Sequence, residues 1–120
     1  MTPISELTNA ELDELIFKLQ GWVKLQPPAY PKWQHPGIDG TKLWFEDYIP
    51  SPTTDPRYAM ELLKEMATDK NLQWVALEYQ PSILKWKLDM LRIPDYQILS
   101  YADTPERAIA EAYAQWKGAK

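Results

Sequence analysis

The chain has 120 residues, of which 45% are hydrophobic and 25% are charged. This is the size and composition of one globular domain, and it excludes a disordered chain. The net charge of −4 argues against duplex nucleic acid as the main partner. The chain has no cysteine, which excludes disulfide bonds and thiolate chemistry.

The hydropathy of the chain bears on where it works. Residues 1–6 lack the basic and apolar parts of a signal peptide, and no apolar run is long enough to span a bilayer. We therefore expect a cytoplasmic protein without a membrane partner.

The first helix is predicted between Thr8 and Gly21. Thr8 and Glu11 have the spacing of a capping box, in which each side chain accepts a hydrogen bond from the other residue's backbone N–H. Apolar residues then recur at helical spacing as far as Gly21, a residue type that commonly follows the end of a helix.

Residues 22–50 form an irregular segment that is rich in proline and tryptophan. Its prolines exclude a helix and allow edge strands at most. A short strand is predicted at Thr41–Tyr48. We interpret the segment as an insertion within a single domain of residues 1–120, and long irregular segments of this kind are often functional.

The second helix is predicted from Pro56 to Ala67. Asp55 can cap its first turn, and proline is favoured at the first helical position. Met60 is among the apolar residues that we expect to face inward.

Three strands follow, joined by links so short that neighbouring strands must pair antiparallel. The first, Leu72–Tyr79, is apolar on both sides around Trp74, which predicts a central strand that is covered on both faces. The second, Leu84–Met90, alternates between apolar and charged residues, and the third is Tyr96–Ser100.

The last helix is predicted from Pro105 to Lys117, again with a threonine just ahead of a proline. The order of elements predicts an α+β fold, in which an antiparallel sheet of three to four strands is covered by three helices in the manner of an α/β/α sandwich. Trp74, Trp86 and Trp116 lie on apolar faces and are expected in the core.

Four short motifs carry a resemblance to a known family. They are Leu12-Asp13-Glu14-Leu15 leading to Gly21-Trp22, the helix start Pro52–Asp55, Val75 with Leu77 in a strand, and the alanine-rich helix start Ala102–Ile109. With these motifs the chain resembles the phage ABA sandwich domain family, a three-layer α/β/α family of phages and prophages. Residues 27–48 match no pattern of that family.

The resemblance implies a phage or prophage origin and a small accessory protein that acts in the host cytoplasm. The family has no established catalytic residues that could be carried over to this chain. Small phage proteins of this kind include counter-defence factors. Some sequester nucleotide signals of bacterial immunity, and others block a defence protein directly.

The sequence offers no catalytic set. The only histidine, His35, lies in the proline-rich segment, and no serine occupies a strand–turn–helix nucleophile elbow. Metal-ligand spacings and glycine-rich phosphate loops are also missing. We therefore expect a protein that is not an enzyme and that uses neither a metal nor a cofactor.

Aromatic residues in and beside residues 22–50 are the best candidates for binding, because flat rings can stack on a base or anchor a protein interface. Backbone N–H groups at the start of the second helix can hold a phosphate. The candidate ligand-binding residues are Trp22, Tyr30, Trp33, His35, Trp44, Tyr48, Thr53, Thr54, Arg57 and Lys85.

Each candidate also has a structural interpretation. The aromatic rings can close a small core beneath the irregular segment, and His35 can be an exposed loop residue. Asp55 can fill the start of the second helix as its cap. Lys85 can belong to a solvated face of the sheet.

Two functions remain open. In the first, the protein is a phage counter-defence protein that binds and sequesters a small nucleotide-derived signal, which requires a concave aromatic pocket with basic groups. In the second, it inhibits a host defence protein by direct contact, which requires a flat aromatic patch with a polar rim. A regulatory or structural phage protein is a third interpretation. We expect a homo-oligomer.

Overall fold

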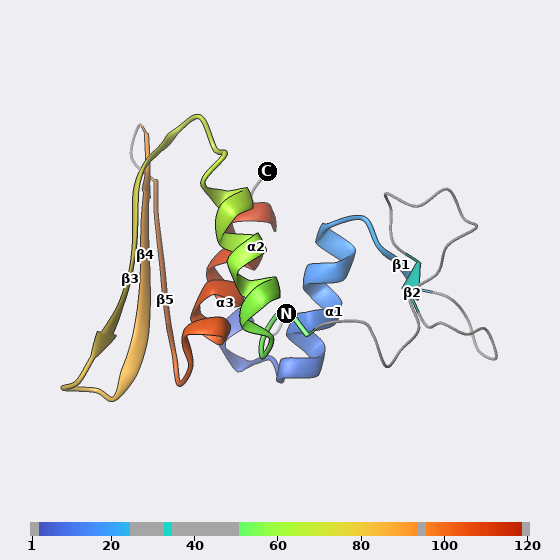
Figure 1. The fold of residues 1–120 in the computed structure, drawn as a ribbon, viewed down its shortest axis with the longest axis horizontal. Helices are drawn as coiled ribbons and strands as arrows, with labels where there is room; N and C mark the ends of the chain where they lie inside the picture. Colours follow the sequence, from blue (N-terminus) through green and yellow to red (C-terminus); the bar gives the residue numbers. More distant parts are fainter. Residues whose placement is uncertain (1–2, 25–32, 35–50, 94–95, 119–120) are drawn as a thin grey trace.

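The computed structural model describes residues 3–24, 33–34, 51–93 and 96–118, and the structural statements below concern these residues. The elements in chain order are η1 (Ile4–Glu6), α1 (Asn9–Leu19), β1 (Val23–Lys24), β2 (Trp33–Gln34), α2 (Pro56–Met66), β3 (Leu72–Gln80), β4 (Lys85–Arg92), β5 (Tyr96–Ala102) and α3 (Pro105–Gly118). Strands β3, β4 and β5 form one antiparallel sheet, with α2 and α3 beside it and α1 beyond them (Figure 1). The predicted α+β class, with three helices and an antiparallel sheet, is confirmed.

The helix boundaries follow the local signals in the sequence. At the start of α1, Thr8 and Glu11 form the predicted capping box, with N–O distances of 2.9 and 3.1 Å. Gly21 follows the helix with a φ of 87°, in the left-handed region that favours glycine. Asp55 accepts a hydrogen bond from the Arg57 backbone N–H at the start of α2.

The strand order is β3-β4-β5, so β4 is the central strand and β3 lies at an edge of the sheet. The prediction that β3 is central is therefore wrong. The sequence pattern also predicts Leu84 as the first residue of the second strand, which is wrong. Leu84 lies in the turn before β4 with a φ of 55° and is 70% exposed. Within β4, Leu88 and Met90 are buried as the alternation predicts, but Asp89, on the charged side of the pattern, is buried as well.

The sheet has two unlike faces. The inner face presents Leu88, Met90 and Ile98, which are all buried in the core beside α2 and α3. The outer face includes Trp74, Asp89 and the residues paired with them, and the described helices all lie on the other side of the sheet (Figure 1). The predicted cover on both faces of β3 is therefore not found among the described residues, and Trp74 is 43% exposed instead of lying in the core.

The core is centred on α3, which contacts α1, α2, η1, β4 and β5. Trp116 is buried and Trp86 packs against the core, as predicted. Met60 was expected to face inward, but it is 53% exposed on α2. The predicted strand Thr41–Tyr48 lies outside the described residues.

Candidate functional site

Six of the ten residues predicted to bind a ligand lie in the irregular segment of residues 22–50. Tyr30, His35, Trp44 and Tyr48 lie outside the described residues. Trp33 is in β2, which pairs with β1 through the partners Lys24 and Trp33, but its side chain is not among those described. The stacking of these rings on a base therefore stays a prediction.

Trp22 is a packing residue. It is 7% exposed, and its ring centroid lies 4.8 Å from that of Phe17 on α1. Tyr58 of α2 meets Phe17 edge-on at 6.1 Å, and burial raises the pKa of the Tyr58 hydroxyl well above its ordinary value. Because this aromatic cluster is closed, Trp22 offers little surface for stacking on a ligand.

The polar groups of the segment that leads into α2 already bind a carboxylate from α1. Asp13 accepts hydrogen bonds from the Ser51 hydroxyl at 2.6 Å and from the Thr53 backbone N–H at 2.9 Å. Thr53 is buried, and Asp55 takes the Arg57 N–H as the helix cap. A phosphate here would meet two negative charges, so the arrangement fits capping better than anion binding.

Among the residues described at this helix start, Thr54 and Arg57 are the predicted ligand-binding residues whose side chains are exposed. Neither lines the cleft that holds Lys85, described next. The structure thus does not gather the predicted phosphate contacts into one site.

Lys85 lies in a polar cleft between β5, α3 and η1, where it pairs with Asp103. The cleft has a volume of about 430 Å³. Its lining residues are Ser5, Asn9, Lys85, Tyr101, Ala102, Asp103, Thr104, Arg107 and Glu111.

Arg107 makes most of the contacts in this cleft. Its Nε donates to Glu111 at 2.8 Å, Nη1 donates to Asn9 at 2.9 Å and Nη2 donates to the Leu7 carbonyl at 2.6 Å. Burial raises the pKa of Glu111, and Arg107 opposes that shift. Lys85 and Arg107, the two cations that line the cleft, are thus each paired with a carboxylate. Through its bonds to Leu7 and Asn9, Arg107 also connects the N-terminal segment to α3.

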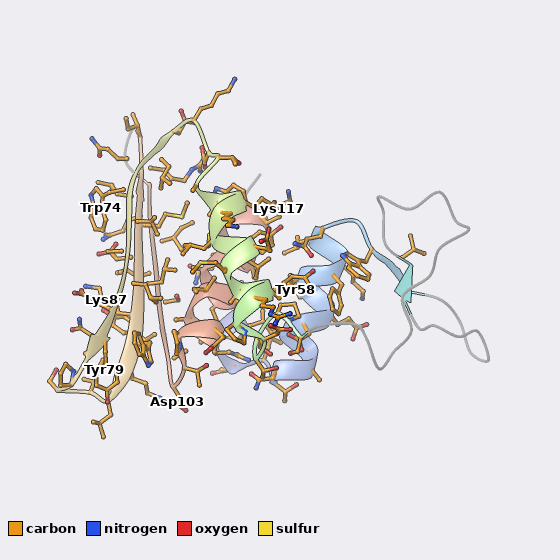
Figure 2. The ribbon with its side chains drawn as sticks, viewed as in Figure 1. Tyr58, Trp74, Tyr79, Lys87, Asp103 and Lys117 are labelled. Carbon is orange, nitrogen blue, oxygen red and sulfur yellow. The ribbon has the colours of Figure 1, made fainter. Side chains whose placement is uncertain are left out.

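The outer face of the sheet carries exposed apolar side chains around a polar centre. Trp74, Leu99 and Tyr101 are 43%, 39% and 45% exposed. Figure 2 shows Trp74 and Lys87 on the side of the sheet that points away from the helices. This surface was missed from the sequence, because Trp74 was assigned to the core.

The polar centre of the outer face is an ordered network. Lys87 Nζ lies 3.6 Å from Glu78 Oε1 and 3.8 Å from Asp89 Oδ2. Gln97 donates to the other Asp89 oxygen at 2.9 Å. The network spans all three strands of the sheet and holds its long side chains in place.

A second feature missed from the sequence is a buried carboxylate at the opposite end of the sheet from the cleft. Asp69 accepts from the Trp116 indole N–H at 2.6 Å, and Arg92 Nε lies 2.6 Å from the same oxygen. Burial alone would raise the pKa of Asp69, but hydrogen bonds from Trp116, the Asn71 backbone and Arg92 lower it to about 2. These contacts join the end of α2 to β4 and α3, which is a structural role.

In the described ranges, no group of three His, Cys, Asp or Glu side chains is placed to hold a metal ion. The helices of the same ranges are too short or too polar to cross a membrane. Comparison with known proteins found no matching family model, no matching curated protein and no matching solved structure.

Proposed function

We propose that this chain is a non-enzymatic binding protein whose partner is another protein, which it contacts through the outer face of its sheet. The observation that carries this proposal is the exposure of Trp74 on β3 and of Leu99 and Tyr101 on β5, each at least 39% exposed on that face. Large rings that are held in place by strands make strong contacts with proteins, because little side-chain freedom is lost on binding.

The charges of the outer face favour a protein over a polyanion. On this face Lys87 is matched by Glu78 and Asp89, so the described network carries no excess of positive charge. A nucleic-acid backbone needs unpaired cations, whereas a protein interface combines an apolar part with polar groups that already have partners. With the phage resemblance, the proposed partner is a host defence protein that this contact inhibits.

Site-specific photo-crosslinking in a bacterial host tests the proposal. A photoreactive residue at Leu99, on the outer face, should give a discrete cross-linked protein. The matched control carries it at Ile83, which is 51% exposed but lies in the turn after β3. Failure of the Leu99 position to cross-link, or equal products from both positions, would contradict the proposal.

Alanine substitution then measures the contribution of the rings. Trp74→Ala should weaken binding of the cross-linked partner about tenfold or more, as expected when a large aromatic ring that contacts the partner is removed. Ile83→Ala should leave the affinity unchanged. Thermal unfolding of both variants shows whether the fold is intact.

Sequestration of a nucleotide-derived signal is the second candidate, and the cleft at Lys85 favours it. Its volume of about 430 Å³ lies within the usual range of small-molecule sites. A phosphate would have to displace Asp103 from Lys85. A ligand present at 100 times its dissociation constant would add about 2.7 kcal/mol to the free energy of unfolding.

A thermal-shift screen with cyclic and ADP-ribose-type nucleotides tests this second candidate. A shift that is lost in Lys85→Ala, with the ligand recovered unchanged after heat denaturation, supports sequestration at the cleft. The absence of any shift leaves protein binding as the function.

A further inference from the structure

The outward edge of β3 is the least protected surface of the sheet. β3 is nine residues long and, among the described strands, pairs with β4 alone. One side of its backbone therefore presents N–H and C=O groups that have no described strand beside them. Such an edge is a template for a further strand, so most proteins shield it with lysine, proline or a covering segment.

Within the described part of the chain, β3 has none of these shields. Leu72–Gln80 contains no proline and no lysine, and Glu78 is its single charged residue. The other edge of the sheet differs, because Gln115 of α3 donates to the Leu99 carbonyl of β5 at 3.3 Å, and Ile4 and Ser5 of η1 line a hollow together with residues of β5. Of the two edges, β3 is the one left open within the described residues.

Side chains on the inner face of β3 are also only partly covered. Val75 and Leu77 pack at the margin of the core, and Tyr79 is 44% exposed although it packs against Trp86. The principal contacts of α3 with the sheet are with β4 and β5. A strand added beside β3 would extend the inner apolar row and cover these three side chains.

The sequence of β3 is complementary to itself in one antiparallel register. With the two-fold axis at Leu77, Val75 of one copy faces Tyr79 of the other, and the two Leu77 side chains face each other. A β-branched residue opposite an aromatic ring is a favourable cross-strand pair. An axis at Ala76 would instead place Tyr79 opposite the polar Gln73.

We propose that two copies of this chain pair along β3 in the register centred on Leu77, and that the two three-stranded sheets join into one. The two-fold axis is perpendicular to the sheet, so both sets of helices lie on one side and both outer faces on the other. The pairing does not depend on the proposed function, but it would place two outer faces side by side.

Ala76 provides the sharpest test, because it is exposed on the outer face and lies opposite Glu78 of the other copy in this register. Ala76→Glu creates two like-charge contacts per dimer, and Ala76→Lys creates two opposite-charge contacts. Analytical ultracentrifugation of the full chain should show a dimer for the wild type. Ala76→Glu should raise the dimer dissociation constant about tenfold, whereas Ala76→Lys should not raise it.

The double variant Ala76→Glu with Glu78→Lys restores opposite charges and should restore the dimer. Circular dichroism and thermal unfolding show that each variant is folded. A wild-type chain that stays monomeric overturns the proposal, as does a dimer that Ala76→Glu and Ala76→Lys weaken equally. Slow amide exchange along β3 in a monomer would show that another part of the same chain covers the edge, which also overturns it.

Discussion

Asp69 is the residue whose environment departs most from what its sequence neighbourhood indicates. In the sequence it belongs to the short polar stretch Asp69-Lys70-Asn71, which ends the second predicted helix. In the structure its side chain is 4% exposed and meets Trp116 and Arg92. These partners are 47 and 23 positions away, so no local pattern could identify the contact.

Replacing Asp69 with asparagine removes the negative charge opposite Arg92 and should destabilise the protein at neutral pH. Breaking a buried ion pair by removing one partner costs about 3 kcal/mol. Urea unfolding at pH 7 measures the loss. As a control, Asp103→Asn removes an ion pair whose carboxylate is 81% exposed, and it should change the free energy of unfolding by less than about 1 kcal/mol.

The same carboxylate predicts how stability changes with pH. The pKa of Asp69 is about 2 in the folded protein and 3.8 without its partners, so its charge stabilises the fold above about pH 4. That contribution falls as the pH drops from 4 toward 2, where the carboxylate becomes protonated in the folded state as well. The difference between wild type and Asp69→Asn should therefore shrink over this range. A difference that stays constant from pH 7 to pH 2 would contradict the assigned pKa.

At the scale of elements, the signals that could be read from the sequence are those that act over a few residues. Capping side chains and prolines determine where a helix begins, so α1, α2 and α3 begin where they were predicted. The position of a strand within a sheet depends on pairing between distant segments. The apolar residues on both sides of β3 therefore could not show that one side stays uncovered.

Gly21 ends α1 with a φ of 87°, and its replacement tests that boundary. A side chain in the left-handed region costs about 1 kcal/mol, so Gly21→Ala should lower the free energy of unfolding by that amount. Gly118→Ala is the matched control, because a Cβ at Gly118, the last residue of α3, would meet nothing within 4 Å. Chemical denaturation should show a loss for Gly21→Ala and no loss for Gly118→Ala, and equal effects would contradict this account.

At the scale of the molecule, the candidate binding surfaces result from how the helices and strands of the chain pack together. The outer face exists because all the described helices lie on one side of the sheet, and the open edge exists because β3 is last in the strand order. Sequence patterns identify residues that are able to bind a ligand, such as Trp22 and Thr53. They cannot show that the Trp22 ring already packs against Phe17, or that the Thr53 N–H already donates to Asp13. This is why the predicted ligand contacts and the observed surfaces differ.

The packing of the helices against the sheet depends on α3, because this helix contacts both other long helices and two strands. Ala108, Ala110 and Ala112 are fully buried, which lets the neighbouring elements approach the α3 backbone. Ala112→Leu adds a side chain where no space is left, and overpacking of this kind costs about 1–3 kcal/mol. Ala10→Leu, at an exposed position near the start of α1, should change stability by less than about 0.5 kcal/mol. Urea unfolding of the two variants measures the difference, and an Ala112→Leu variant as stable as the wild type would show that α3 is not the tightly packed centre of the fold.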